Sequence, residues 1–296
     1  MEGTVESTKL IEHYKDALDE NSIGAFVYEH RDSKFQGSFF RDFDILLLVI
    51  QESEQSCEMI NHIMYEDKRC QLLRINYMEL RGMLVAGEKR DLVRCVFEGQ
   101  IISDMDGRLT NIRLEFQEFK QPLRDQKMFF EFSKFLCLYL EAKRYMSEGY
   151  IMDAYHSVTD SLHHWAQIEL VERGIRPELN VWEQVRGLNT AVHKLYNELT
   201  VSKESVEQRV ELVLLGCEFS VLSKMAECSN LLIKVMGSRN KPWSIEELIR
   251  HPQLEMVSSE LPLVLRKLVY RSIIKEVMNV SVGGNDRKQA ILYSTI

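Results

Sequence analysis

The 296-residue chain predicts an α+β fold in which a small mixed sheet precedes a helical bundle and a short C-terminal domain. In the first 120 residues, short runs of β-forming residues alternate with polar turns and short amphipathic segments. Helical periodicity then extends from Pro122 to Met236, interrupted only by short turns. Two shorter helical segments and a Gly-rich hairpin signal complete the chain. We therefore expect three domains, at 1–120, 121–237 and 238–296.

The first domain is expected to begin with an amphipathic helix, because Leu10, Tyr14 and Leu18 recur at helical spacing. A polar segment at 66–69 separates two β-forming runs and indicates a hairpin, although a short helix at 57–64 fits the same residues. The expected helices are 6–18, 78–85 and 89–97, and the expected strands are 22–30, 45–50, 59–65, 70–77 and 100–103. The segment at 109–120 begins the change to the helical pattern of the second domain. These elements form a small mixed sheet with helices packed on it.

Long helices joined by short turns indicate an up-and-down bundle in the second domain. The expected helices run over 123–147, 149–173, 181–199 and 203–236. In the third domain, Ser244 and Glu247 form a capping-box pattern at the start of a short helix that ends before Pro252. A helix at 259–273 and strands at 277–282 and 289–296 follow, with the hairpin signal at 283–286. Two helices and a terminal hairpin resemble a winged helix.

The composition is that of a globular protein in a reducing compartment, with 45% hydrophobic and 28% charged residues. The longest apolar run, Ile45 to Ile50, is far shorter than the ~20 residues that cross a bilayer, and the acidic N-terminus is unlike a signal peptide. The six cysteines show no Cys-x-x-Cys pair and no histidine at zinc-site spacing. We expect a cytoplasmic protein without membrane contacts, whose cysteines are reduced and mostly in the core.

The C-terminal domain has a different charge from the rest of the chain. Residues 238–296 carry nine Lys and Arg against six Asp and Glu, a net +3 within a total of -8, so the other residues carry -11. Four cations lie on or just after the helix at 259–273, and a recognition helix could present them to DNA phosphates. These cations are Arg266, Lys267, Arg271 and Lys275. A solvated charged face, or a surface for protein contact or homodimer formation, is the alternative.

The central feature of the first domain is the stretch from Phe39 to Gln51, in which Asp42 and Asp44 precede a continuous apolar strand. Residues two apart on a strand point to the same face, so both carboxylates project together from its start. Such a pair can hold one or two divalent cations through hard oxygen ligands, and a bound triphosphate completes the coordination. This arrangement is typical of phosphoryl or nucleotidyl transfer. A strand that merely begins with solvated acids is the alternative.

A mixed sheet that carries Asp-x-Asp and precedes a helical bundle resembles the minimal nucleotidyltransferases, which include aminoglycoside nucleotidyltransferases and bacterial MNT proteins. With its winged-helix-like tail, the whole chain resembles the YgxA type of nucleotidyltransferase-like protein from Firmicutes. The stretch from Asp153-Ala-Tyr-His to Trp182-Glu-Gln-Val shares this resemblance. The resemblance implies that Mg²⁺ or Mn²⁺ and a nucleoside triphosphate bind at Asp42 and Asp44, which would act as metal ligands and catalytic residues of a transferase.

In active relatives a Gly-Ser pair before the Asp-x-Asp holds the phosphates, and this chain offers two imperfect matches. Gly24-Ala25 has Ala in place of Ser and falls inside an expected strand, whereas only three residues separate Gly37-Ser38 from Asp42. Either pair can place backbone N–H groups near a phosphate. We take Gly37, Ser38 and the neighbouring Arg41 as the candidate nucleotide-binding residues.

Active relatives also carry a third carboxylate on a later strand. Here the strand at 72–77 offers Asn76 where the family has Asp. An asparagine can bind a metal through its carbonyl oxygen but brings no charge, so it would hold a second cation less well. The other candidates are Glu79, Glu98 and Asp104. We therefore expect weak or lost nucleotidyl transfer.

The helix at 149–173 carries a polar stripe of Asp153, His156, Asp160 and His164. A carboxylate and an imidazole three residues apart are the unit of bundle metal sites, but such sites take ligands from several helices. The stripe could instead face the transfer site across a cleft between sheet and bundle, where His156 is the candidate general base for a substrate hydroxyl. Buried, hydrogen-bonded histidines are the third interpretation.

Two functional hypotheses follow. The first is a nucleotidyltransferase-like protein that binds a metal and a nucleotide and acts weakly, or no longer, on an unidentified acceptor. The second is a non-catalytic regulator whose winged helix contacts DNA or protein. A lesser alternative is ribonuclease activity, because Arg186 and His193 have the Arg-x6-His spacing of HEPN ribonucleases, a spacing that also occurs often by chance.

Overall fold

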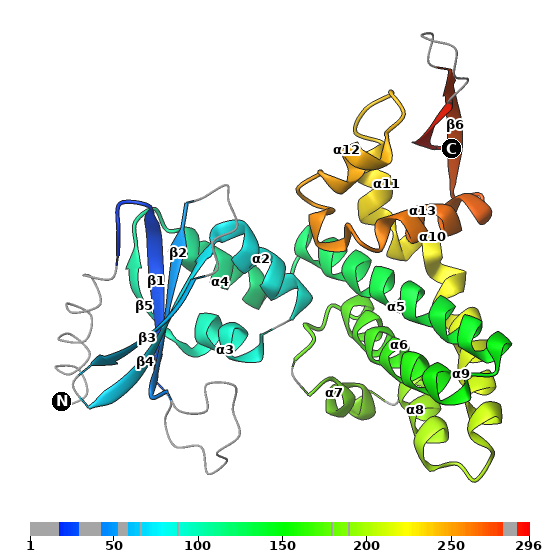
Figure 1. Cartoon of the computed structure of the whole chain (residues 1–296), viewed down its shortest axis with the longest axis horizontal. Helices are drawn as coiled ribbons and strands as arrows, with labels where there is room; N and C mark the ends of the chain where they lie inside the picture. The colour runs from blue at the N-terminus through cyan, green and yellow to red at the C-terminus, as the bar shows by residue number, and fades with distance from the viewer. Residues whose placement is uncertain are drawn as a thin grey trace. The chain divides into compact units, whose positions relative to one another are not determined.

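The structure is a computed structural model, and it describes residues 18–29, 43–52, 59–65, 67–87, 89–178, 180–188, 190–280 and 289–296. The chain forms two compact units, Met1–Glu118 and Phe119–Ile296. Figure 1 shows a sheet with its helices in the first unit, and a helical bundle with a C-terminal hairpin in the second. The predicted α+β class is confirmed. The helix expected at 6–18 lies outside the described residues, apart from Leu18.

A five-stranded mixed sheet forms the centre of the first unit, with strand order β3-β4-β2-β1-β5. β2 pairs in parallel with β4, and the other neighbouring strands are antiparallel. Every residue of β2 is buried, and a continuous apolar run is what a strand covered on both faces requires. The strands are β1 (Ser22–Glu29), β2 (Ile45–Gln51), β3 (Met59–Tyr65), β4 (Lys68–Asn76) and β5 (Gln100–Asp104).

The hairpin predicted around 66–69 is confirmed. β3 and β4 pair residue by residue up to Tyr65 and Lys68, so only two residues remain for the turn. The alternative of a short helix at 57–64 is wrong, because residues from Met59 onward are hydrogen-bonded to β4 as a strand.

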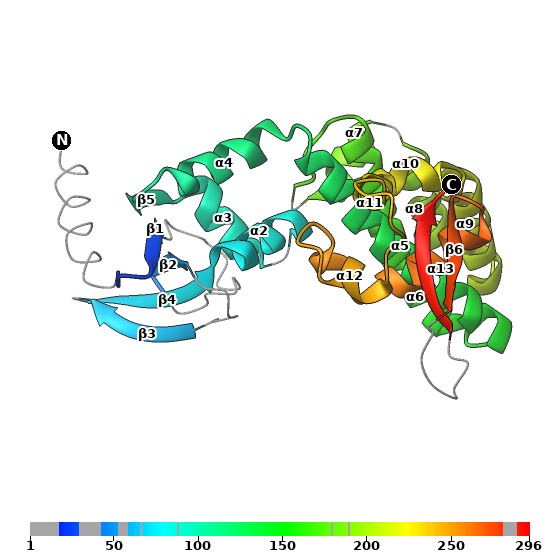
Figure 2. The same ribbon diagram turned by 90° about the horizontal axis from the view of Figure 1, so that it is seen from above.

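Three helices pack on one face of this sheet: α2 (Tyr77–Ala86), α3 (Arg90–Glu98) and α4 (Arg108–Glu118) (Figures 1 and 2). They confirm the helices predicted at 78–85 and 89–97, and α4 occupies the segment at 109–120 where the pattern was expected to change. The opposite face carries an apolar cluster from alternating strand positions, which includes Val27, Leu47 and Leu72 and against which Leu18 packs.

Two long helices, α5 (Leu123–Glu148) and α6 (Ile151–Glu172), lie side by side at the centre of the second unit (Figure 1). They confirm the helices predicted at 123–147 and 149–173. Gly149 connects them with a φ of +81°, a left-handed conformation that glycine adopts without strain. The shorter helices α7 (Val181–Gly187), α8 (Ala191–Val201) and α9 (Val206–Ser220) pack against α6.

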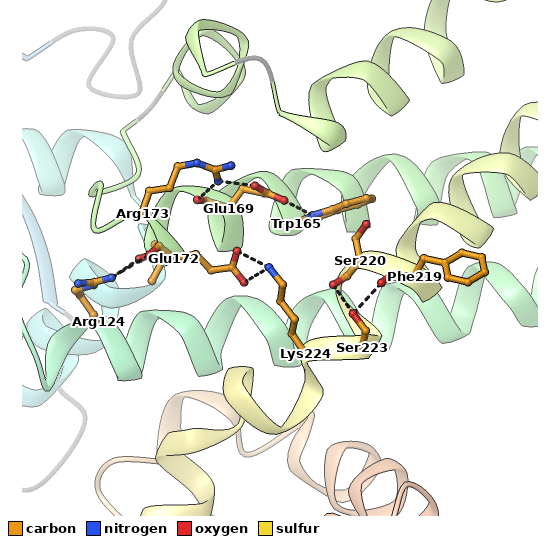
Figure 3. A network of polar contacts seen from close by, with 10 residues as sticks. Arg124, Trp165, Glu169, Glu172, Arg173, Phe219, Ser220, Ser223 and Lys224 are labelled. Atoms are coloured by element: carbon orange, nitrogen blue, oxygen red, sulfur yellow. Dashed lines mark hydrogen bonds and ion pairs between the residues drawn. The ribbon is translucent and has the colours of Figure 1, made fainter.

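The single helices predicted at 181–199 and 203–236 are wrong, because each is interrupted. The first breaks after Gly187, and α8 restarts with Thr190 as its N-cap, whose hydroxyl accepts a hydrogen bond from His193 N. The second ends at Ser220 and continues as η2 (Leu222–Lys224), α10 (Met225–Cys228) and α11 (Asn230–Met236). At this break, the Ser223 hydroxyl donates to main-chain carbonyls of the preceding turn (Figure 3).

A polar network fixes the C-terminal end of α6 (Figure 3). Arg124 on α5 donates to the carbonyl oxygens of Val171 and Glu172 at 2.9 and 3.3 Å, which are acceptors that a helix end leaves free. Both carboxylate oxygens of Glu172 accept from Lys224 Nζ at 3.0 Å, and this interaction raises the pKa of Lys224. The network therefore ties α5 and η2 to the end of α6.

The C-terminal region forms short helices and a hairpin, as predicted. α12 (Ile245–Ile249) begins with the predicted capping box, in which Ser244 Oγ accepts from Glu247 N and the Glu247 carboxylate accepts from Ser244 N. A 3-10 turn, η3 (Glu255–Val257), precedes α13 (Leu261–Tyr270), and β6 (Ile274–Val280) then pairs with β7 (Gln289–Thr295). The predicted turn at 283–286 lies outside the described residues.

The described cysteines are free thiols, and all of them except Cys137 are buried, as predicted. Cys57 lies outside the described residues. Within the described part of the chain, no helix combines the length and the apolar character needed to span a membrane.

Candidate functional site

The candidate site lies at the edge of the first sheet where the parallel strands β2 and β4 both begin. We call it the head edge and define it by Asp44, Arg69, Tyr28 and Glu98. Because β2 and β4 run in parallel in an unbroken register, Asp44, which directly precedes β2, lies beside Arg69, the second residue of β4. The head edge is therefore built by the register of the central strands.

Asp44 is exposed at the start of β2 and is held by the residue that faces it on β4. Its N–H donates to Arg69 O at 2.8 Å, and its Oδ2 accepts from Arg69 N, also at 2.8 Å. Its Oδ1 has no hydrogen-bond partner among the residues that the structure describes. One carboxylate oxygen therefore orients the side chain, and the other is available to a cation.

Glu98 is a second carboxylate at the head edge, in addition to Asp44, and comes from α3. Tyr28 on β1 pairs with Leu46, which is two residues beyond Asp44 and on the same sheet face. The Tyr28 hydroxyl donates to Glu98 Oε2 at 3.4 Å, and this contact brings the end of α3 to the head edge. Burial, and then the negative charge of Glu98, raise the pKa of Tyr28, so the phenol remains a donor at neutral pH. Arg94 Nε lies 3.8 Å from Glu98 Oε1 and partly offsets its charge.

Asn76 does not lie at the head edge, and the prediction that it replaces the third carboxylate is wrong. It pairs with Gln51 at the opposite end of β2 from Asp44, roughly 20 Å away for strands that rise about 3.3 Å per residue. Its side chain accepts from Glu79 N at 2.7 Å, and Glu79 Oε2 accepts from Asn76 N at 3.2 Å. This capping box begins α2, so Asn76 and Glu79 have a structural role.

Asp104 also lies at the far end of the sheet, because it pairs with Gly24, which in turn pairs with Ile50 near the end of β2. Its carboxylate accepts from the N–H groups of Leu109 and Thr110 at 3.0 and 2.9 Å and caps α4. Burial alone would raise the pKa of Asp104, but the hydrogen bond from the Thr110 hydroxyl at 2.7 Å and those from the two N–H groups lower it. Glu98 is therefore the candidate third acid that reaches the head edge.

Gly24 is required by the packing of the sheet. A Cβ atom at this position would lie 2.2 Å from Ser103 O and 2.8 Å from Leu109 Cδ1. Glycine inside a strand often marks such a close backbone approach, and this explains the Gly24-Ala25 pair without a phosphate. The other predicted residues of the nucleotide site lie outside the described residues, and their roles stay predictions: Gly37, Ser38, Arg41 and Asp42.

The polar stripe predicted on α6 divides into two parts. Asp153, His156 and Asp160 are exposed, and His156 Nε2 lies 3.7 Å from Asp160 Oδ2. His164 is mostly buried, with Nδ1 at 2.6 Å from Glu131 Oε2, so the interpretation as a buried, hydrogen-bonded histidine is confirmed for this residue. Among the described residues, no three His, Cys, Asp or Glu side chains are placed to hold a metal ion. The role of His156 as a general base stays a prediction.

Lys127 and Glu131 are not among the residues predicted from the sequence, yet they form a buried ionic cluster with His164. Glu131 is fully buried on α5, and its Oε1 lies 2.6 Å from Lys127 Nζ. Because a carboxylate only accepts, the proton of the second contact is carried by His164 Nδ1. Burial alone would raise the pKa of Glu131, but Lys127 and His164 hold it below its ordinary value. The sequence did contain a signal for this ion pair, because Lys127 and Glu131 are opposite charges four residues apart on an otherwise apolar helix.

An aromatic column lies beside this cluster and joins α6, α7 and α8. The ring of His163 is 6.1 Å from that of Trp182, which stacks on Tyr196 at 4.0 Å between centroids. Burial, and then the neighbouring His164, lower the pKa of His163, so this imidazole is neutral at pH 7. All three rings are only partly buried, so the column offers an accessible aromatic surface.

Arg186 and His193 do not share a continuous helix. The break between α7 and α8 separates them, Arg186 Nη1 lies 3.5 Å from Glu183 Oε2, and His193 N donates to Thr190. The sequence spacing that suggested a ribonuclease is therefore interrupted by a helix end.

The cations predicted for DNA contact do not form one unpaired surface. Arg266 Nη1 lies 3.1 Å from Glu276 Oε1 on β6, and Arg271 Nη2 lies 4.0 Å from Glu218 Oε1 on α9. Burial, and then the charge of Arg271, lower the pKa of Lys267. The cations of α13 are thus partly engaged within the second unit.

Comparisons with known proteins agree with this architecture. Three family models match successive parts of the chain: residues 9–124 match a nucleotidyltransferase-like family, residues 125–224 a YgxA-like substrate binding domain, and residues 230–285 a helix-turn-helix domain. The last match supports the winged-helix-like domain predicted for the tail, in that it identifies a helix-turn-helix domain there.

Two relatives extend the similarity over nearly the whole chain. The uncharacterized protein YgxA of Bacillus subtilis (strain 168) is 29% identical over 254 residues, which are 86% of this chain and 85% of that protein. The crystal structure of a nucleotidyltransferase-like protein from Exiguobacterium sibiricum 255-15 is 28% identical, with a TM-score of 0.84 over 98% of this chain and 99% of that chain. The chain is therefore a nucleotidyltransferase-like protein of the YgxA type, with a nucleotidyltransferase-like domain, a YgxA-like domain and a helix-turn-helix domain in that order.

Proposed function

We propose that the first domain binds a nucleoside triphosphate with Mg²⁺ or Mn²⁺ at the head edge, and that nucleotidyl transfer to an acceptor is weak or lost. The observation that carries this proposal is the Asp44 carboxylate, which Arg69 N orients through one oxygen while the other oxygen has no hydrogen-bond partner among the described residues. Asp42, two residues earlier, is the second proposed ligand. The nucleotidyltransferase-like family match over residues 9–124 supports the assignment.

The environment of Glu98 supports the expectation of weak transfer. Two-cation transfer sites depend on concentrated negative charge. Here the third acid accepts a hydrogen bond from Tyr28 and is close to Arg94, so less of its charge is available for a second cation. A single divalent cation would neutralise the phosphates of a nucleotide that Gly37, Ser38 and Arg41 contact.

The bundle is the proposed place of the acceptor. The family that matches residues 125–224 is described as a substrate binding domain, and α6 in this region carries the exposed His156. An exposed imidazole is a suitable base for an acceptor hydroxyl. The partly exposed rings of Trp182 and Tyr196 would stack on a planar group of the acceptor.

Asp44→Asn is expected to weaken the binding of ATP, GTP or CTP in the presence of Mn²⁺ by at least about tenfold, or about 1.4 kcal/mol. The substitution preserves the shape of the side chain but removes the charge that attracts the cation. Isothermal titration calorimetry of each nucleotide with Mn²⁺ measures this effect. Asp106→Asn is the matched control, because it removes an exposed carboxylate that pairs with Arg108 beyond the far end of β5. Equal affinities of wild type and Asp44→Asn would contradict the proposal.

Transfer itself is tested by incubating the protein with radiolabelled nucleotides, Mg²⁺ or Mn²⁺ and a cell extract. We expect little label on any acceptor, and no gain from Asn76→Asp, because this position is at the wrong end of the strand. Robust wild-type transfer that is lost in Glu98→Gln would instead show an intact enzyme in which Glu98 is the third acid.

DNA binding by the C-terminal domain is the second proposed function, and the helix-turn-helix match over residues 230–285 favours it. In this arrangement α13 is the proposed recognition helix, and Lys275 is exposed just beyond it at the start of β6. Protein contact through the same domain is the alternative, because Arg266 and Arg271 are already close to carboxylates.

Arg266→Ala and Lys267→Ala are expected to weaken DNA binding about equally for all sequences. Each should also reduce the slope of the logarithm of the binding constant against the logarithm of the salt concentration by about one, because one phosphate contact is lost. Glu276→Gln should have the opposite effect, because it releases Arg266 from the ion pair at 3.1 Å. Fluorescence anisotropy with a labelled duplex at several salt concentrations measures both changes. Absence of binding at low salt would support protein contact.

A further inference from the structure

β3 is an edge strand of the first sheet and is exposed on both faces. Its one neighbour in the sheet is β4. Each residue from Met59 to Met64 is exposed, and four of these six side chains are apolar, with Ile60 at 53% and Met64 at 65% exposure. Among the described strands no other one pairs with this edge, and apolar side chains on both faces of such an edge are unusual for a monomeric protein.

Within its own residues, β3 carries none of the sequence features that usually protect a sheet edge. The strand Met59-Ile-Asn-His-Ile-Met-Tyr65 contains no lysine, no carboxylate and no proline. Its register with β4 is continuous over seven residue pairs, without a bulge that would twist the edge away. Strands with these properties readily add a further strand.

The hairpin geometry determines which backbone groups face outward. In a hairpin with a two-residue turn, the pair that flanks the turn, here Tyr65 and Lys68, exchanges both hydrogen bonds. The pattern alternates along an antiparallel ladder. The N–H and C=O groups of Ile60, His62 and Met64 therefore point away from β4, toward the open edge.

We propose that β3 pairs with β3 of a second copy of this chain, in antiparallel orientation and centred on His62. This register places His62 opposite His62 of the partner subunit and uses the outward backbone groups of Ile60, His62 and Met64 in both copies. The two five-stranded sheets then join into one continuous sheet.

The side chains of β3 are self-complementary about this centre. Ile60 falls opposite the partner's Met64, so that exposed apolar side chains meet across the new pair on this face of the sheet. Because β3 contains no lysine, arginine or carboxylate, two copies of it can pair without charge repulsion. A two-fold interface requires a surface that complements itself, and β3 meets this requirement better than it would match an arbitrary extended peptide.

Analytical ultracentrifugation of the full chain tests the association. The wild type is expected to dimerise, and Met64→Lys should raise the dimer dissociation constant by more than about tenfold, because two added lysines protect the edge. Met105→Lys is the matched control, because Met105 is 80% exposed in the same unit but lies beyond β5. A monomeric wild type at all soluble concentrations, or a Met64→Lys protein that dimerises like the wild type, would overturn the proposal.

Cross-linking tests the register. His62→Cys is expected to form a covalent dimer with a short bis-maleimide, because the two positions face each other across the axis. Met59→Cys should not do so, because its two copies are six residue steps apart, or about 20 Å. The wild type supplies the background from its own cysteines, most of which are buried. Equal cross-linking of both variants would exclude the proposed register, and circular dichroism confirms that each variant is folded.

Discussion

Replacing Lys127 with methionine is expected to lower the free energy of unfolding of the second unit by about 3–5 kcal/mol at pH 7. The substitution keeps an unbranched side chain but removes the cation that lies 2.6 Å from Glu131 Oε1. Because Glu131 is fully buried, its charge would then be compensated by His164 alone, or the carboxylate would take up a proton. Both outcomes cost free energy in the folded state.

The pH dependence of this effect follows from the pKa of Glu131. In the wild type this pKa is lowered by folding, so the carboxylate contributes stability above its unfolded pKa and loses that contribution as the pH falls through its folded pKa. In Lys127→Met, burial is less opposed and the folded pKa rises. The deficit of the variant is therefore greatest at neutral pH, and it shrinks as acid protonates Glu131 in both proteins.

Tryptophan fluorescence during urea unfolding measures this stability, because all three tryptophans lie in the second unit. The double variant Lys127→Met/Glu131→Gln is the control, since it removes the buried carboxylate charge together with its cation and should recover much of the loss. Equal stability of wild type and Lys127→Met at pH 7 would show that the buried pair is not ionised.

Gly24→Ala is expected to destabilise the first unit by about 3 kcal/mol, at the upper end of the cost of overpacking. The added Cβ would lie 2.2 Å from Ser103 O, which is a main-chain atom that cannot rotate away. β1 and β5 would therefore have to separate at the point where Gly24 pairs with Asp104.

Thermal unfolding followed by circular dichroism measures this loss, while the tryptophan signal of the second unit should not change. Gly82→Ala is the matched control, because nothing lies within 4 Å of its added Cβ, and alanine in a helix should be neutral or stabilise by up to about 1 kcal/mol. If Gly24→Ala proved as stable as Gly82→Ala but bound Mn²⁺ and nucleotide more weakly, Gly24 would have a phosphate-binding role instead.

Local sequence patterns were sufficient for most elements of the fold. The alternation of β-forming runs and polar turns predicted all five strands of the first sheet, and the long periodic segments predicted α5 and α6 within a few residues. These patterns show which side chains of an element must be buried, and this can be determined from neighbouring residues in the sequence. The helices at 181–199 and 203–236 were extended too far, because a cap such as Thr190 competes with a periodicity that continues across it.

The composition of the candidate site depended on which strands pair with each other, and a sequence does not show strand pairing directly. The sequence by itself determined that Asp42 and Asp44 precede a buried strand, and the structure places Asp44 accordingly at the start of β2. Only the tertiary structure decided that Asn76, on β4, lies beside the far end of β2 and that Glu98 reaches the head edge through Tyr28. The physical reason is that a parallel register and the docking of α3 join residues that are distant in sequence, whereas periodicity reports burial and not the identity of the neighbour.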